Sequence, residues 1–180
     1  MKIWLSLCLF GLLAFSAPLE DEKIAWSDDY RLSWNDFKGP ISEGTSFVAS
    51  TNSGLSFGYS IKIINGEATN QFTFRVNSYF YPQLSWYDPA RVNDRVLRHE
   101  QTHFDITELH ARKLRKRIAQ FTFTTNVKDE LDVIYDENER ERRAMQAQFD
   151  FETDHSVLRE PEAAWEQKIA TLLQAYEGYK

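Results

Sequence analysis

The pentapeptide His99-Glu100-Gln101-Thr102-His103 is the part of the sequence best suited to chemistry. It fits the HExxH pattern, in which two histidines stand four residues apart. On a helix such residues project from the same face, so both imidazoles can bind one tetrahedral zinc ion. Glu100 adjoins the first histidine, and its carboxylate can accept a proton from a zinc-activated water. The pattern predicts metal binding at His99 and His103, with Glu100 as the general base of a hydrolase.

A catalytic zinc site needs a third protein ligand, and the sequence offers two further histidines, His110 and His155. His110 follows His99 by eleven residues, so a helical rise of about 1.5 Å per residue separates their Cα atoms by about 16 Å. No glycine or proline between residues 104 and 109 would break the helix. We therefore expect His110 to be structural or to lie at the surface.

His155 is the preferred third ligand for a topological reason. Helical patterns cover residues 90–120 and 127–149, and an antiparallel pair of these helices would place positions near 148 beside His99. The loop expected at residues 150–155 would then lie over the metal. The alternatives for the third ligand are Asp150, Glu139 and Glu141.

Upstream of the helices the sequence favours β-structure. Residues Tyr30 to Gly39 alternate apolar and polar types and end before a proline, which predicts a strand and a turn. A stronger alternation runs from Ser46 to Tyr81 and is interrupted by Asn65-Gly66, a dipeptide typical of tight hairpin turns. We expect this segment to form a small antiparallel sheet.

Apolar residues and histidines recur every three or four positions over residues 90–120, which predicts one long amphipathic helix with Asp88 as N-cap and Pro89 in its first turn. A third helix is expected over residues 161–176. The basic run Arg112 to Arg117 is interpreted as a solvated face that complements the helix dipole. The expected fold is therefore α+β, zincin-like, with an N-terminal antiparallel sheet packed against a helical layer that carries the HExxH helix.

The N-terminus indicates export. Residues 1–16 combine Lys2 with a short apolar run that ends in small residues, as in a secretory signal peptide, and residues 17–180 are expected to form a single domain. The only cysteine, Cys8, lies in the signal segment, so no disulfide is expected in the exported domain. The net charge of −6 gives no electrostatic reason to bind nucleic acid, and no stable membrane insertion is expected after signal removal.

Three stretches of the sequence resemble a bacterial domain family known as predicted secreted zinc-dependent proteases. Residues 97–106 are similar to its helix motif, and residues 32–39 to its opening strand. Asp150, Thr153 and His155 are similar to its downstream segment. The resemblance covers most of the exported domain.

The resemblance implies metal ligation at His99 and His103, catalysis at Glu100 and a site role for His155. Ser156 departs from the family pattern, which has glycine there, and Phe149 stands in place of a tyrosine.

Together these features predict an exported, zinc-dependent metallopeptidase that binds a peptide or protein substrate. The alternatives are a zinc amidase that acts on non-protein amides and a non-catalytic periplasmic binding or assembly module that retains a metal site. Loss of hydrolysis with retention of zinc in a Glu100→Gln variant would favour an enzyme over such a module.

Overall fold

The alternating segment forms a long β-hairpin in the computed structural model, which describes residues 22–180. Strand β3 (Ser53–Ile64) pairs antiparallel with β4 (Glu67–Phe80). Asn65 and Gly66 join them with φ angles of 53° and 84°. Both positive values suit a tight hairpin turn, which asparagine and glycine adopt at low steric cost. The predicted hairpin is therefore confirmed, whereas the predicted signal peptide and Cys8 lie outside the described residues.

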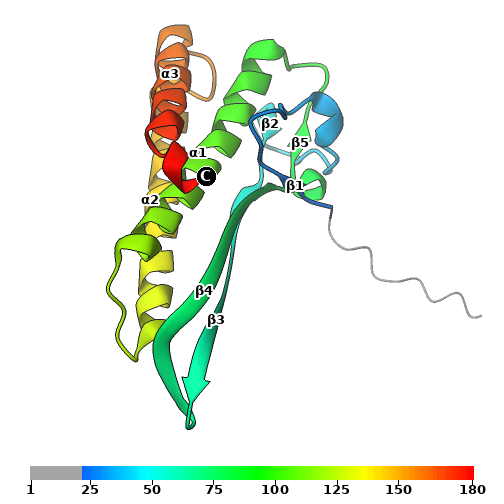
Figure 1. The fold of residues 1–180 in the computed structure, drawn as a ribbon. Helices are drawn as coiled ribbons and strands as arrows, with labels where there is room; N and C mark the ends of the chain where they lie inside the picture. The colour runs from blue at the N-terminus through cyan, green and yellow to red at the C-terminus, as the bar shows by residue number, and fades with distance from the viewer. Residues whose placement is uncertain (1–21) are drawn as a thin grey trace, which may run out of the picture.

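Within residues 22–180, three short strands complete the β-structure. Strand β1 (Ile24–Ala25) pairs with β4 to give the sheet order β1-β4-β3. Strand β2 (Ala49–Ser50) pairs antiparallel with β5 (Trp86–Tyr87) in a separate two-stranded sheet. The tip of the β3–β4 hairpin points away from this small sheet (Figure 1).

The strand predicted over residues 30–39 is wrong. This segment contains a short 3-10 helix, η1 (Trp34–Asp36), because the Asp36 carboxylate accepts hydrogen bonds from both the backbone N–H and the hydroxyl of Ser33. Such local side-chain bonds offer the backbone an alternative to a strand ladder. Leu32 and Phe37 still reach the core, where they pack against Phe80 and Phe104. A second 3-10 helix, η2 (Pro82–Leu84), precedes β5.

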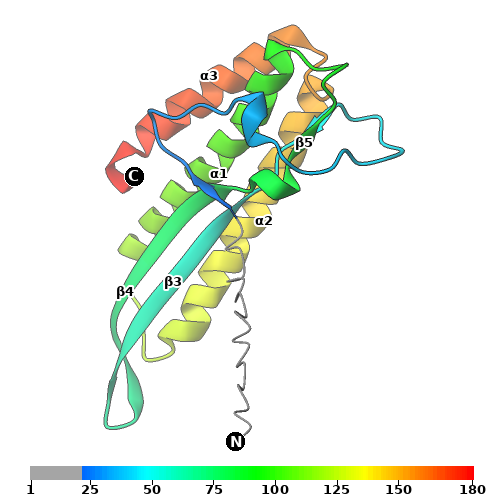
Figure 2. The same ribbon diagram turned by 90° about the vertical axis from the view of Figure 1, so that its right-hand side faces the viewer.

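Long helices form the other layer of the described part of the chain (Figures 1 and 2). They are α1 (Asp94–Gln120), α2 (Val127–Thr153) and α3 (Arg159–Ala175), followed by the 3-10 helix η3 (Glu177–Tyr179). The architecture is α+β with an antiparallel sheet beside a helical layer. Among the described residues no helix is both long enough and apolar enough to cross a membrane.

Helix α1 starts later than the sequence suggested. The side chain of Asn93 accepts hydrogen bonds from the backbone N–H groups of Arg95 and Val96, at 3.0 and 3.3 Å, and so caps the helix. Asp88 instead stabilises the preceding turn, because it accepts a bond from the N–H of Ala90. The predicted N-cap at Asp88 is therefore wrong.

Helix α1 lies at the centre of the packing. One core cluster joins its C-terminal half to the hairpin and to α2 through Val76, Leu114, Ile118, Val127 and Leu131. A second cluster joins α1 to α2 and α3 through Ile106, Leu109, Phe149, Trp165 and Ile169. Contacts such as Arg117 with Glu141 and His103 with Gln146 run in opposite directions along α1 and α2, so the predicted antiparallel pair is confirmed.

The basic run at the end of α1 is not the solvated face that was expected. The Arg112 side chain is only 1% exposed, and it donates to Glu108, to the carbonyl of Leu173 and to Glu177. Its guanidinium also lies over the Trp26 ring, 5.2 Å from the centroid.

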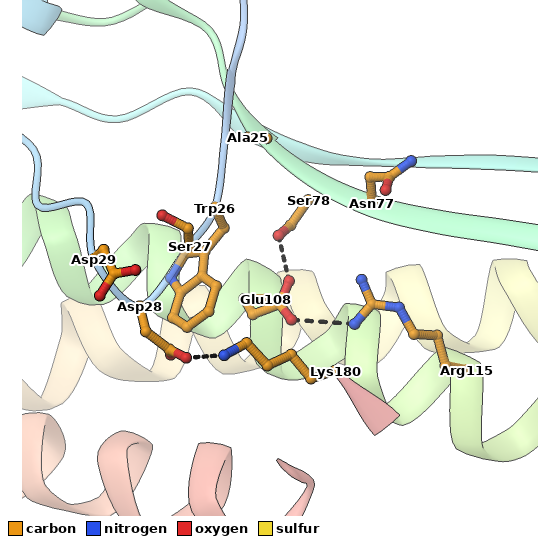
Figure 3. Close-up of a pocket in the computed structure, with 10 residues that line it drawn as sticks. All are labelled: Ala25, Trp26, Ser27, Asp28, Asp29, Asn77, Ser78, Glu108, Arg115 and Lys180. Carbon is orange, nitrogen blue, oxygen red and sulfur yellow. Dashed lines mark hydrogen bonds and ion pairs between the residues drawn. The ribbon is translucent and has the colours of Figure 1, made fainter. Parts of the chain in front are cut away.

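Neighbouring ion pairs extend this network. Glu108 accepts bonds from Ser78 and Arg115, and Lys180 pairs with Asp28 (Figure 3). A buried guanidinium needs such partners, because an unpaired charge away from water is costly.

Candidate metal centre

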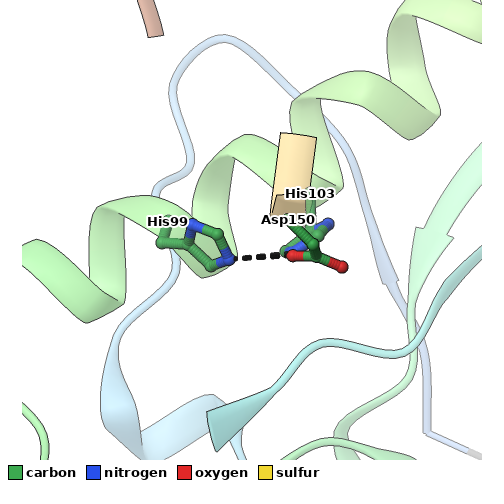
Figure 4. A group of neighbouring side chains, drawn as sticks. All are labelled: His99, His103 and Asp150. Atoms are coloured by element: carbon green, nitrogen blue, oxygen red, sulfur yellow. Dashed lines mark hydrogen bonds and ion pairs between the residues drawn. The ribbon is translucent and has the colours of Figure 1, made fainter. Parts of the chain in front are cut away.

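His99 and His103 lie one turn apart on the first half of α1, with their side chains directed toward α2 (Figure 4). Their Nε2 atoms are 3.1 Å apart. The four-residue spacing brings both rings to the same face of the helix. Both residues therefore lie where the HExxH pattern placed them.

Asp150 is the third potential metal ligand, next to His99 and His103. Its Oδ1 lies 3.1 Å from Nε2 of His99 and 2.9 Å from Nε2 of His103. The expected loop at residues 150–155 is wrong in its first part, because α2 continues to Thr153 and Asp150 belongs to its last turn. The antiparallel packing of α1 and α2 thus brings a helical carboxylate to the two histidines.

The geometry of this group suits a tetrahedral metal ion. Ligand atoms bound to zinc at about 2.0–2.1 Å lie about 3.3 Å from one another in a tetrahedron. The three atoms contributed by His99, His103 and Asp150 are separated by 2.9 to 3.1 Å. In residues 22–180 this is the group of metal-binding side chains that converges closely enough to share one ion.

His155 lies at the edge of the site. Its Nδ1 is 3.6 Å from Oδ1 of Asp150, and its side chain is 45% exposed. The ring packs against Phe47, with centroids 4.6 Å apart. The structure therefore brings Asp150, and not His155, into the converging trio, although His155 lines the same cleft.

The backbone that carries His155 is strained. Asp154, His155 and Ser156 have φ angles of 47°, 49° and 72°, so three consecutive residues other than glycine adopt the left-handed conformation. Each such residue costs on the order of 1–2 kcal/mol relative to the right-handed region. Strain of this kind often accumulates at functional sites, where surrounding contacts hold the backbone in place.

The other candidate ligands lie elsewhere. His110 is fully buried, as expected for a structural residue, and neither of its ring nitrogens has a hydrogen-bond partner among the described residues. Glu139 forms an ion pair with Arg142, and Glu141 forms one with Arg117. Those two carboxylates are neutralised by arginines and do not join the histidines.

Each histidine of the trio is held from behind by a hydrogen bond to its Nδ1. Both carboxylate oxygens of Glu162 lie close to Nδ1 of His99, at 3.1 and 3.2 Å. Nδ1 of His103 bonds to the side-chain carbonyl of Gln146. Phe149 stacks on the His99 ring with a centroid distance of 4.4 Å. These contacts fix the ring planes and leave each Nε2 facing the shared position.

The electrostatics of the site favour a positive charge. Burial lowers the pKa of His99, but hydrogen bonds to Asp150 and Glu162 and the charge of Glu100 outweigh burial and raise it to about 9. Burial acts in the opposite direction on Asp150 and raises its pKa. Hydrogen bonds and charge interactions with His99 and His103 outweigh burial and hold the pKa of Asp150 well below its usual range. The carboxylates of Asp150 and Glu162 thus favour a positive charge at His99.

Glu100 has the surroundings expected of a general base. It is only 4% exposed, and its Oε2 has no hydrogen-bond partner among the described residues. It lines a cleft of about 790 Å³ together with His99, His103 and Asp150. A buried carboxylate oxygen without a partner is costly, and a water in the cleft would satisfy it.

Two residues that contact the histidines, Glu162 and Gln146, are not indicated by any pattern in the sequence. In the sequence, Gln146 stands among other polar residues of a helical segment. Glu162 lies 63 residues from His99, the histidine that it contacts. No local pattern distinguishes either residue from a solvated side chain.

One family model matches the chain over residues 28–156, and its description is "Bacterial protein of unknown function (DUF922)". The match spans more than half of the sequence, so the protein belongs to this family. No curated protein and no solved structure gives a significant match. The family description names no activity and no metal. Helix α3, which carries Glu162, lies beyond the matched residues.

Proposed function

We propose that the protein is a zinc-dependent hydrolase, a metallopeptidase with a zincin-like arrangement of sheet and active-site helix. The observation that carries the proposal is the convergence of ligand atoms of His99, His103 and Asp150 within 3.1 Å of one another. Next to them lies Glu100, whose Oε2 has no hydrogen-bond partner within residues 22–180. Two imidazoles and one carboxylate are a donor set typical of catalytic zinc.

The residues of the site divide the chemistry between them. His99, His103 and Asp150 would hold the ion, and zinc bound there would lower the pKa of a coordinated water to about 7 and polarise a carbonyl. Glu100 accepts the proton of the attacking water and transfers it to the leaving amine. Glu100 is buried, and since its Oε2 lacks a hydrogen-bond partner among the described residues, that oxygen is free to orient the water.

His155 fits a role in stabilising the developing negative charge on the substrate oxygen. Its ring is partly exposed at the cleft and lies 3.6 Å from Asp150, close to the place where a carbonyl would be polarised. An imidazole N–H aimed at the oxyanion would lower the barrier to attack.

The wall of the cleft suits an extended peptide. Residues 46–51 line it, and β2 has no strand partner on the edge opposite β5 among the described residues. The carbonyl of Val48 accepts the N–H of Asp88 from the β5 side, so the main-chain groups of Ala49 and Thr51 point to the other edge. A substrate backbone could pair with these groups as an added strand.

We further propose that the protein is exported and acts in the periplasm or outside the cell on peptide or protein substrates. The support is the signal-like sequence of residues 1–16.

Metal analysis of purified variants tests the ligand set. Wild type is expected to bind one zinc ion per chain, whereas His99→Ala and Asp150→Ala lose it. His155→Ala is the matched control, because it removes an imidazole from the same cleft but is expected to retain zinc. Loss of zinc from the His155 variant with retention in the Asp150 variant would overturn the assignment.

Hydrolysis by Glu100→Gln tests the enzyme. Removing the general base is expected to lower kcat at least 100-fold against a peptide library while zinc content stays unchanged. If zinc-loaded wild type cleaves neither peptides nor other amides, the proposal of a hydrolase fails and a non-catalytic metal-binding module takes its place.

A further inference from the structure

Helix α3 places one acidic side chain against the metal centre from a part of the chain that the family match does not reach. Glu162 belongs to the first turn of α3 and is only 2% exposed. Its two oxygens lie 3.2 and 3.1 Å from Nδ1 of His99, on the side of the ring opposite Asp150. His99 is thus held between two carboxylates.

Glu162 is a buried carboxylate, so its negative charge must be compensated by neighbouring groups. Among the described residues its carboxylate forms an ion pair with His99 and with no arginine or lysine. A carboxylate removed from water is costly unless a positive charge or hydrogen-bond donors compensate for it. The N-terminus of α3 supplies a partial positive charge, but that would serve an exposed acid equally well. Among the described residues the compensating charge is at His99, as a protonated imidazole or as a metal ion bound through that ring.

We propose that Glu162 is a positioning residue for the metal centre: it accepts the Nδ1 proton of His99, fixes the tautomer whose Nε2 lone pair faces the metal, and thereby raises zinc affinity. This inference rests on the proposed zinc site. A metal-bound imidazole must be neutral with its proton on the other nitrogen, and a carboxylate behind the ring makes the bound nitrogen more basic.

The two histidines differ in this respect. His103 has the neutral side chain of Gln146 behind it, whereas His99 has a buried charge. The Glu162 contact is therefore expected to contribute more to metal affinity. Helix α3 is held in place by Trp165, which packs against Phe149, and by the ion pair of Glu166 with Arg98. The C-terminal helix thus serves the site although it supplies no ligand.

The test compares the zinc dissociation constants of wild type, Glu162→Gln and Glu162→Ala, measured by competition with a chromophoric chelator at constant pH. Glutamine keeps an acceptor for the Nδ1 proton but removes the charge, whereas alanine removes both. Zinc binding is expected to weaken about 10-fold in Glu162→Gln and up to about 100-fold in Glu162→Ala. Glu160→Gln is the matched control, because Glu160 is an exposed acid in the same helical turn, and its zinc affinity is expected to equal that of wild type.

A second measurement separates positioning from mere stabilisation of the fold. In zinc-loaded wild type, long-range ¹H–¹⁵N spectra are expected to show His99 as the Nδ1-protonated tautomer with a slowly exchanging proton, and Glu162→Ala loses that protection. A variant that is less stable yet binds zinc with wild-type affinity would overturn the inference and leave the zinc site intact. Failure of wild type itself to bind zinc would overturn both the inference and the proposed function.

Discussion

Replacing His110 with leucine is expected to make the protein more resistant to acid. His110 is fully buried on α1, and its ring nitrogens lack hydrogen-bond partners among the described residues. Burial, together with the positive charges of Lys113, Arg142 and Arg117, lowers the pKa of His110 from 6.5 to about 3. Between pH 6.5 and about 3 the ring is therefore neutral in the folded protein and protonated in the unfolded chain.

The sign and size of the effect follow from linkage. Between pH 6.5 and about 3 the unfolded chain binds a proton that the folded state excludes, so the unfolding free energy falls as the pH falls. At about 1.4 kcal/mol per pH unit, the contribution of His110 reaches about 2 kcal/mol at pH 5 and at most about 5 kcal/mol near pH 3. Above pH 6.5 this contribution disappears.

Urea unfolding of metal-free wild type and His110→Leu measures the effect. Chelator is present throughout, so that zinc binding at His99 and His103 does not add its own pH dependence. At pH 7.5 the variant is expected to be at least as stable as wild type, because leucine leaves no buried polar nitrogen unpaired. At pH 5 its advantage is expected to grow by about 2 kcal/mol. Parallel stability curves across this range would refute the argument that His110 is kept neutral by its surroundings.

Three further changes have expected outcomes. Ser156→Gly relieves a φ angle of 72° and is expected to raise the unfolding free energy by about 1 kcal/mol in urea titrations; a loss of stability would contradict the strain. Asn93→Ala removes the cap of α1 and is expected to cost about 1 kcal/mol, whereas Asp88→Ala, at the position first predicted as the cap, should leave the start of the helix intact in hydrogen exchange. Removing metal with chelator is expected to lower the melting temperature, and zinc at 100 times its Kd should restore about 2.7 kcal/mol. Identical melting curves with and without zinc would speak against a metal centre.

The parts of the fold that depend on local patterns were predictable. Alternation around Asn65-Gly66 predicted the β3–β4 hairpin, because the period of two and the turn residues both act within a few positions. The apolar spacing likewise predicted α1 and its two inward histidines. The antiparallel arrangement of α1 and α2 followed from the short connection between them.

The predictions failed where one local signal competed with another. Asp88-Pro89 and Asn93 are both good helix starts, and only the packed structure shows that the chain makes a turn at the first and begins the helix at the second. Residues 30–39 alternate as a strand would, but the bonds from Ser33 to Asp36 hold a 3-10 turn.

The part of the metal site that lies on a single helix, α1, was predictable from the sequence. The spacing of His99 and His103 is a local property, and the structure places the two rings together. The choice between Asp150 and His155 depended on whether α2 ended before or after residue 150, which is a matter of a single helical turn. Glu162 depended on how α3 folds back on α1, for which the sequence carries no local signal.

The guanidinium of Arg112 links the first and last described segments of the chain to one point on α1. Trp26 lies beneath it near β1, while the carbonyl of Leu173 and the carboxylate of Glu177 bind it from the other end of the sequence. Detachment of either segment would remove a favourable contact from that buried cation, a cation–π contact at one end and two hydrogen bonds at the other. Amide protons of β1 and η3 should therefore exchange with solvent as one cooperative unit, even though about 150 residues of chain lie between them.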